Sequence, residues 1–195
     1  MQISKTLLVA FAGEKGAYSE DAILAFYGDV ATLPCRHFSD VFKAVLQGRA
    51  DAGVVPVENS QAGSVTDTYD LLLHYPLTIY GEVTLQIRHC LMALHGESIG
   101  TITTVMSHPQ GLAQSEEFLK KLPNIKIVSE TNTAASAKRI RDEKLKGYAA
   151  IASQRVASIY GLEILAGGIE NIDSQSFILR CRIPLKHIET FFIIY

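Results

Sequence analysis

The chain has 195 residues, of which 48% are hydrophobic and 19% charged, and its formal net charge is −2 at pH 7. This length and composition suffice for a packed core in one domain or two small ones. Because both signs of charge are interspersed and the apolar runs are too short to cross a bilayer, we expect neither a nucleic acid nor a membrane partner.

Three cysteines, Cys35, Cys90 and Cys181, are widely separated along the chain. An odd number at such spacing is typical of reduced thiols rather than of a disulfide framework. No Cys and His pair has the spacing of zinc ligands, so we predict no metal site. The N-terminal residues lead directly into a patterned strand rather than into a cleavage site. We therefore expect a cytoplasmic protein.

Strand and helix patterns alternate along the first part of the chain. This alternation with short connections predicts βαβ units and a mostly parallel sheet. Serines stand where helices are expected to begin, and glycines where they end. The expected elements are a strand over 7–11, a helix capped by Ser19 and ended by Gly28, a helix from Ser39 to Gly48, a strand over 52–57 and a helix over 64–74.

The segment from Leu77 to Leu94 interrupts this alternation, because it is long, extended and rich in β-branched residues. It is predicted to cross from one lobe to a second. We expect residues 1–80 plus about 165–195 to form the first lobe and 81–164 the second. The elements expected after the crossover are strands over 101–106, 125–129 and 148–152, and helices over 110–121, 133–144 and 153–160.

The most informative stretch is GVVPVENSQAGSV at residues 53–65. An apolar strand ends there in a polar cluster of Glu58, Asn59 and Ser60, and Gly63 and Ser64 open a helical pattern. In open α/β sheets ligands bind at the carboxyl ends of strands, and a helix N-terminus favours an anion. A capped turn, with Ser64 as N-cap and Asp67 in the first turn, explains the same residues.

Four further segments accompany this one: GEKGAYSE at 13–20, SHPQGLAQ at 107–114, TNTAASA at 131–137 and YAAIASQRVASIYGLEIL at 148–165. In order and spacing the five segments resemble the prephenate dehydratase family, including its plant-type arogenate dehydratases. The resemblance extends from about residue 7 to about residue 170. It implies two α/β lobes with a central cleft, in the type II periplasmic-binding-protein architecture, with the ligand in the cleft.

The resemblance also implies a reaction. Prephenate would lose its ring carboxylate as CO2 and its ring hydroxyl as water to give phenylpyruvate, and arogenate would give phenylalanine. Aromatisation drives the reaction, so no cofactor is expected. The site must hold two carboxylates and help hydroxide to leave by proton donation or strong hydrogen bonding. Nothing in the sequence decides between the two substrates.

The family motifs map onto particular residues of this chain. Glu58 and Asn59 match the Glu-Asn-Ser motif and are our catalytic candidates together with Ser176. A plain N-cap explains Ser19 equally well, and a lone His such as His108 is often structural. We assign less weight to Arg88 and His89 on the crossover. The residues expected to bind substrate are Ala17, Tyr18, Ser19, Ser60, Gly63, Ser64, His108, Gln110, Thr133, Ala134 and Phe177.

The chain departs from the family at one motif. A Thr-Arg-Phe triplet is expected on the strand that returns to the first lobe, and this chain has Gln175, Ser176 and Phe177 there. In the family the Thr is the favoured donor to the leaving hydroxyl and the Arg helps to bind substrate. Ser174 or Ser176 is a candidate replacement for the hydroxyl donor, and Arg180 or Arg182 for the cation. An impaired enzyme, a prephenate decarboxylase and a ligand-binding protein without turnover remain alternatives.

Family members generally continue into an ACT domain that binds phenylalanine. The residues after the Gln-Ser-Phe triplet are too few for one, so we expect no phenylalanine feedback through such a domain. The apolar run from Phe191 to Tyr195 is β-prone and is predicted to pack in the core, to pair with a partner or to favour aggregation. With the family's habit of pairing, this run leads us to expect a homodimer or a higher homo-oligomer.

Overall fold

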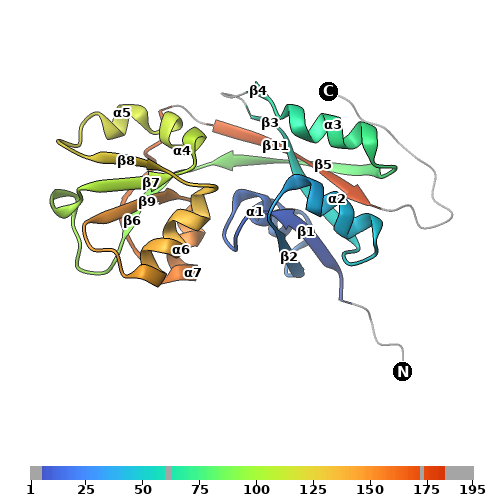
Figure 1. Ribbon diagram of the computed structural model, residues 1–195, viewed down its shortest axis with the longest axis horizontal. Helices are drawn as coiled ribbons and strands as arrows, with labels where there is room; N and C mark the ends of the chain where they lie inside the picture. The colour runs from blue at the N-terminus through green and yellow to red at the C-terminus, as the bar shows by residue number, and fades with distance from the viewer. Residues whose placement is uncertain (1–5, 60–62, 172–173, 183–195) are drawn as a thin grey trace. The chain divides into compact units, whose positions relative to one another are not determined.

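The computed structural model describes residues 6–59, 63–171 and 174–182, the last stretch by its backbone alone. The chain forms two compact units, each with strands and helices (Figure 1). Two α/β lobes, the expected fold class, are thereby confirmed. Unit 1 holds the described residues up to Gly13, then Ser19–Leu85, then those from Gln175 onward, and unit 2 holds Glu14–Tyr18 and Gln86–Ser174.

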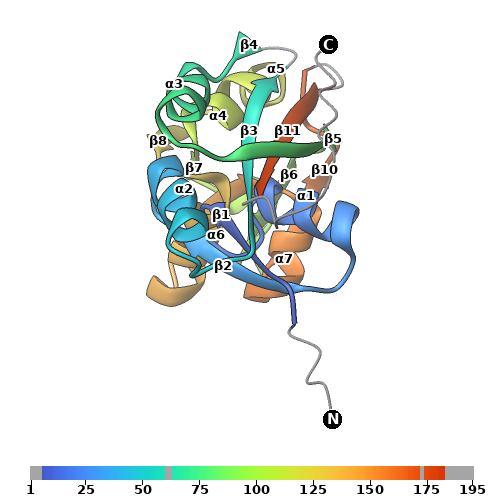
Figure 2. The same ribbon diagram turned by 90° about the vertical axis from the view of Figure 1, so that its right-hand side faces the viewer.

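The sheet of unit 1 has strand β3 at its centre, with β1 on one side and β11 on the other (Figure 2). Strand β1 pairs in parallel with β2 and β3, whereas β11 and β4 run antiparallel to β3. The sheet is therefore mixed, not mostly parallel as expected, because these two strands enter it in the opposite direction. The strands, in the order β2-β1-β3-β11-β5 with β4 beside β3, are β1 (Leu8–Ala12), β2 (Ala31–Cys35), β3 (Ala52–Asn59), β4 (Gly63–Ser64), β5 (Thr78–Ile87) and β11 (Ser174–Arg182).

Three helices accompany these strands in the described part of the chain: α1 (Tyr18–Tyr27), α2 (Phe38–Leu46) and α3 (Thr66–His74). The sequence places each of them correctly to within about two residues, but none of the expected serine caps is observed. Helix α1 already includes Ser19, and His37 precedes α2 as its N-cap. Ser64 lies in β4 opposite Glu58, and Val65 precedes α3 instead. Pairing of Ser64 with β3 prevents it from capping the helix.

Unit 2 contains a second mixed sheet, in the order β10-β6-β9-β7-β8. Strands β7, β8 and β9 are parallel, and β6 and β10 are antiparallel to their neighbours. The strands are β6 (Cys90–Ala93), β7 (Thr104–Ser107), β8 (Lys126–Ser129), β9 (Tyr148–Ala152) and β10 (Glu163–Gly167), and the helices are the 3-10 helix η1 (Ile99–Thr101), α4 (Pro109–Gln114), α5 (Glu116–Leu119), α6 (Thr133–Glu143) and α7 (Gln154–Tyr160).

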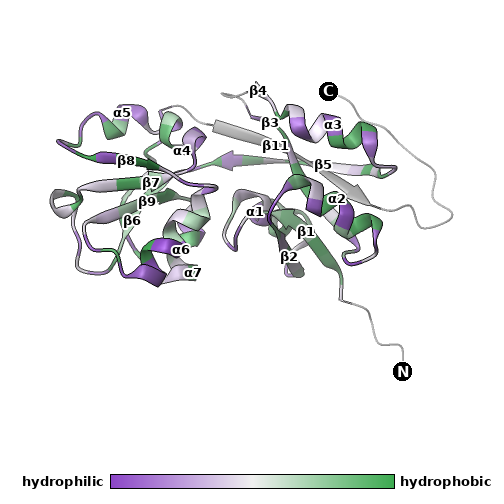
Figure 3. Cartoon of the chain, in the orientation of Figure 1, coloured by the Kyte–Doolittle hydropathy of each residue, from purple (hydrophilic) through white to green (hydrophobic). Residues whose placement is uncertain are grey.

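Helices cover both faces of this sheet, because alternate residues of β9 pack against different pairs of helices. Ala150 and Ala152 pack with residues of α6 and α7, while Ala149 and Ile151 pack with residues of α4 and α5 on the other face. Successive side chains of a strand point to opposite faces, so a strand buried on both is apolar throughout. Figure 3 shows β9 largely hydrophobic, whereas α6 also carries hydrophilic residues.

Two expectations for unit 2 were wrong. The helix expected over 110–121 is two short helices, α4 and α5, which meet at Ser115. Residues near 165 do not return to the first sheet, because β10 pairs with β6 in the second. The return comes with β11, and the crossover itself is extended over β5 and β6 as predicted. In the described part of the chain, no helix is long and apolar enough to span a membrane.

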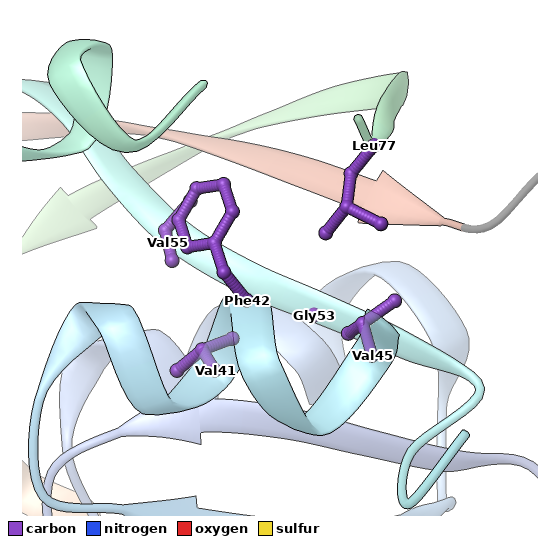
Figure 4. Close-up of a pocket in the computed structure, with 6 residues that line it drawn as sticks. All are labelled: Val41, Phe42, Val45, Gly53, Val55 and Leu77. Atoms are coloured by element: carbon purple, nitrogen blue, oxygen red, sulfur yellow. The ribbon is translucent and has the colours of Figure 1, made fainter. Parts of the chain in front are cut away.

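Helix α2 packs tightly onto β3 in unit 1. Figure 4 shows Val41, Phe42 and Val45 of the helix over Gly53 of the strand. A Cβ at Gly53 would lie 2.7 Å from Val41 Cγ1 and 3.1 Å from Val45 Cγ2. Both valines are fully buried and β-branched side chains rotate little, so they cannot yield easily. This apolar contact belongs to the core and leaves no room for a water molecule.

Gly53→Ala should therefore destabilise the protein by about 1–3 kcal/mol, the usual cost of overpacking a core. Chemical denaturation followed by circular dichroism measures the change. Gly100→Ala is the matched control, because Gly100 lies exposed in η1 and only Ser98 Oγ, at 3.9 Å, is near its Cβ position. Equal midpoints for Gly53→Ala and wild type would contradict the close approach of α2.

Candidate functional site

The His-Pro-Gln motif forms the turn between strand β7 and helix α4. His108 is the N-cap of the helix, and its Nδ1 accepts a hydrogen bond from the Gln110 backbone N–H at 3.2 Å. The ring is half-buried, and this burial lowers the pKa of His108. With Nδ1 acting as an acceptor, the neutral ring carries its proton on Nε2. His108 therefore positions α4 and has a ring donor left for a ligand.

The Thr-Ala motif begins helix α6. Asn132 is the N-cap, and its side chain accepts from the Ala135 N–H at 2.7 Å. The N–H groups of Thr133 and Ala134 precede the first intrahelical donors and have no acceptor within the helix. The side chain of Ala134 is fully buried, so its contribution to a site is its backbone. Two backbone donors at this helix start favour an anion.

Gly111 brings these two turns together. A Cβ on it would lie 2.9 Å from Ser107 Oγ, 3.4 Å from Thr133 Cγ2 and 3.7 Å from His89 Cε1. Ser107 is fully buried and donates to the Ile151 carbonyl at 2.7 Å, which fixes its hydroxyl. The carboxyl end of β7, the start of α6 and His89 thus meet at one point of unit 2.

The Ala-Tyr turn of the first motif also belongs to unit 2, although strand β1 before it belongs to unit 1. Backbone and side-chain contacts attach this segment. Lys138 pairs with Glu14 at 2.8 Å, Tyr160 donates to the Lys15 carbonyl at 2.9 Å, and Ser153 donates to the Gly16 carbonyl at 3.3 Å. Ala17 is buried, and the Tyr18 hydroxyl lies 2.9 Å from Nδ1 of His89. This attachment places Tyr18 beside the crossover.

The remaining candidates other than Ser19 lie in unit 1, at the end of β3 or on the strands paired with it. Asn59 is buried, whereas the Glu58 side chain is exposed and therefore available to a ligand. Strand β4 pairs here, with Ser64 opposite Glu58 and Gly63 opposite Asn59. On the other side of β3, β11 places Phe177 opposite Glu58 and Ser176 opposite Asn59. Ser60 and the expected apolar end from Phe191 to Tyr195 lie outside the described residues.

The candidate residues thus form one group in each unit. In unit 1 the strand pairing brings the Glu-Asn motif beside the Gln-Ser-Phe segment, and Ser19 is in the first turn of α1, apart from these strands in the chain. In unit 2, Ala17 and Tyr18 belong with the two helix starts. Within the described ranges, no three His, Cys, Asp or Glu side chains are grouped to hold a metal ion.

Sequence reasoning gave too little weight to His89 and missed Gln114 and Glu170. His89 is fully buried, and Gln114 Oε1 lies 2.9 Å from its Nε2. Glu170 Oε2 accepts from the His89 backbone N–H at 2.8 Å. In the sequence, apolar Ile87 and charged Arg88 precede His89, and strand alternation continued through them predicts an inward His89. The structure buries His89, although residues 88 and 89 lie between β5 and β6.

The tight approach of α4 predicts that Gly111→Ala destabilises the protein by about 1–3 kcal/mol, since the new methyl group meets the fixed Ser107 hydroxyl. The cost should fall in a Ser107→Ala background, which removes that oxygen. Denaturation of the two single variants and the double variant gives the coupling, expected to be about 1 kcal/mol. Strictly additive costs would show that Ser107 does not limit the approach of Gly111.

Comparison with known proteins agrees with these motifs. The family model described as prephenate dehydratase matches residues 9–176, most of the chain. An arogenate dehydratase/prephenate dehydratase from Arabidopsis thaliana, named as chloroplastic, is 45% identical over 163 residues, which are 84% of this chain and 42% of that protein. The chain thus spans less than half the length of this curated relative.

Two solved structures are similar over nearly the whole chain. A prephenate dehydratase from Arthrobacter aurescens, crystallised with L-Phe, is 29% identical with a TM-score of 0.87, covering 95% of this chain and 63% of that one. A protein described as a novel type of quorum quenching acylase is 31% identical with a TM-score of 0.85, covering 94% and 66%. With a family match that begins in β1 and continues into β11, the chain belongs to the prephenate dehydratase family.

Proposed function

We propose that the chain is a lyase that converts prephenate to phenylpyruvate, or arogenate to phenylalanine, in aromatic amino acid biosynthesis. The observation that carries the proposal is the family match over both units. It is supported in unit 2 by the starts of α4 and α6, which approach each other at Gly111. The substrate carries two carboxylates. The first N–H groups of α6 have no acceptor within the helix, so this helix start suits such an anion without a cofactor.

The reaction assigns each group a task. The ring carboxylate leaves as CO2, its bonding electrons enter the ring, and the ring hydroxyl leaves as water after it gains a proton. The N–H groups of Thr133 and Ala134 and the side chain of Gln110 would hold a carboxylate. Glu58, exposed at the end of β3, would orient the hydroxyl or act in proton transfer.

The departing hydroxyl also needs a hydrogen-bond donor. Ser176 is our candidate, because β11 pairs it with Asn59 of the Glu-Asn motif. A serine hydroxyl can donate a hydrogen bond to developing hydroxide as a threonine does. The arginine of the family triplet is replaced as well, so substrate binding would depend more on the backbone donors of unit 2.

A prephenate decarboxylase is the second candidate, and the observation that favours it is the Gln175-Ser176 replacement itself. Loss of CO2 with protonation of the ring needs no donor to the hydroxyl. The product would keep its hydroxyl and stay non-aromatic. A protein that binds prephenate without turnover is the remaining alternative from a different class.

A cytoplasmic location and a homo-oligomeric state also stay predictions. The described cysteines Cys35 and Cys90 are free, which suits a reducing compartment. The plant relative is named as chloroplastic, so a reducing organelle fits these thiols equally well. Sedimentation of the purified protein would decide the oligomeric state.

Proton NMR of the purified protein with prephenate, and separately with arogenate, tests the proposed reaction against a control without protein. We expect phenylpyruvate or phenylalanine to form faster than in the control. Thr133→Ala keeps the backbone N–H but removes the side-chain hydroxyl at the start of α6, so it should lower kcat/KM by roughly 10-fold or more. Thr131→Ala, two residues earlier at an exposed position, should not. A non-aromatic product would favour the decarboxylase, and unchanged substrates would favour binding alone.

Restoring the family triplet tests the role of β11. The double variant Gln175→Thr, Ser176→Arg removes the Ser176 hydroxyl but places a hydroxyl and a cation where the family has them, so its dehydration rate should rise by roughly 10-fold. Ile178→Val is the control, since it changes a neighbouring residue of β11 without adding a hydroxyl or a cation. If the double variant is no faster, the chain has replaced both groups elsewhere.

A further inference from the structure

His89 is the largest fully buried polar side chain at the unit 2 site. It is 1% exposed, and its ring lies edge-on to that of Tyr18 with 5.7 Å between centroids. A buried polar ring needs partners for its nitrogens, because an unpaired one costs about 1–3 kcal/mol. Tyr18 and Gln114 meet this need from two different helices, α1 and α4.

The partners fix how the ring is protonated. Gln114 Oε1 is an acceptor, so Nε2 of the neutral ring carries the proton and Nδ1 is an acceptor 2.9 Å from the Tyr18 hydroxyl. The hydroxyl donates to the Arg88 carbonyl at 2.8 Å, so this carbonyl and Nδ1 compete for its one proton. If the ring gains a second proton, Nδ1 becomes a donor to the hydroxyl oxygen, and the Arg88 carbonyl is then the one acceptor of the two. The charge on His89 therefore sets the direction of the Tyr18 hydroxyl.

The backbone of His89 is fixed as firmly as its ring. Its N–H donates to Glu170, and its carbonyl accepts from the Ile169 N–H at 3.2 Å. Asn171 follows Glu170 in the chain. Its backbone N–H donates to the Gln114 carbonyl at 2.6 Å, and its side-chain amide donates to the Ala113 carbonyl at 3.0 Å. The segment just before β11 is thus bonded both to His89 and to the end of α4.

We propose that His89 is a positioning residue of the unit 2 site, which fixes the direction of the Tyr18 hydroxyl and the place of helix α4. Helix α4 carries Gln110 at one end and the His89 partner Gln114 at the other. The Cε1 atom of His89 also lies 3.7 Å from the position that a Cβ of Gly111, between them, would take. The inference rests on the proposed function only in that Tyr18 and Gln110 bind the substrate.

The groups that face His89 define the pH at which this arrangement changes. Burial lowers the pKa of His89, and the hydrogen bond to Gln114 and the Glu170 carboxylate oppose the shift. Tyr18 is the other titratable contact, and the Arg88 side chain is bonded to Gln86. Unfolded His89 gains its proton near pH 6.5 and folded His89 only at lower pH, so stability falls as pH drops through that window.

Two substitutions of His89 test the proposal with purified full-length protein. His89→Leu keeps the volume and removes both ring nitrogens, and we expect kcat/KM to fall roughly 10- to 100-fold. His89→Asn keeps a polar group near the position of Nδ1 and should recover part of this loss. Protonation of the wild-type His89 should lower kcat/KM at acidic pH, and His89→Asn should remove this acidic limb of the pH profile. His95→Leu, at an exposed His of the same unit, is the control.

NMR of the labelled protein gives a readout that needs no turnover. The His89 ring should carry its proton on Nε2 at neutral pH, with a titration midpoint below that of a free histidine. The backbone amides of Tyr18 and Gln114 should shift with the same midpoint, and that of Ile127 on edge strand β8 should not. This comparison stays informative if His89→Leu does not fold.

The outcomes separate the two proposals. Turnover of neither substrate by the wild type overturns the proposed function, and the NMR titration still decides whether His89 controls Tyr18 and α4. The positioning role would be overturned if the amide chemical shifts of Tyr18 and Gln114 did not change at the titration midpoint of His89. So would wild-type kinetics for His89→Leu. Coupled titration with loss of the acidic limb in His89→Asn would support it.

Discussion

The close approach of helix α4 to the end of strand β7 is the constraint on which the unit 2 site depends. It requires a residue without a side chain at Gly111, since a Cβ there would meet Ser107, and it requires a fixed Ser107 hydroxyl. With α4 in this place, Ser107, Thr133 at the start of α6 and the buried His89 all lie within 4 Å of the position of a Gly111 Cβ. A small change in packing at Gly111 would move all three, because close-packed interiors transmit strain.

The same constraint explains why the polar groups near Gly111 are arranged in pairs. A buried imidazole, a buried serine and an amide side chain are each costly unless they are hydrogen-bonded. Ser107 meets the requirement through the Ile151 carbonyl, and His89 through Tyr18 and Gln114. These bonds are directional, so they fix the orientation of α4 as well as its distance. Groups that must bind a carboxylate in a set geometry need such support.

Much of the fold was predictable because the hydrophobic periods are regular and the turns are marked by glycines. Strand β9 and helix α6 are found where they were expected. The failures share a cause, which is that contacts distant in sequence override local signals. Ser64 has the local pattern of an N-cap, but pairing of β4 with β3 removes it from the helix. β10 carries no local mark of its partner, so its pairing with β6 could not be read from the sequence.

The site was predictable as motifs but not as networks. Glu58 and Asn59 were recognised from one stretch, yet only the register of β11 shows that Ser176 pairs with Asn59. Register is set by pairing along whole strands, so residue 176 stays opposite Asn59 whichever side chain it carries. The side chains of the family triplet can therefore be replaced while the backbone at these positions stays paired beside the Glu-Asn motif. Because strand pairing is a backbone property, a change of reaction at this position needs new side chains only, and the two α/β units need no rebuilding.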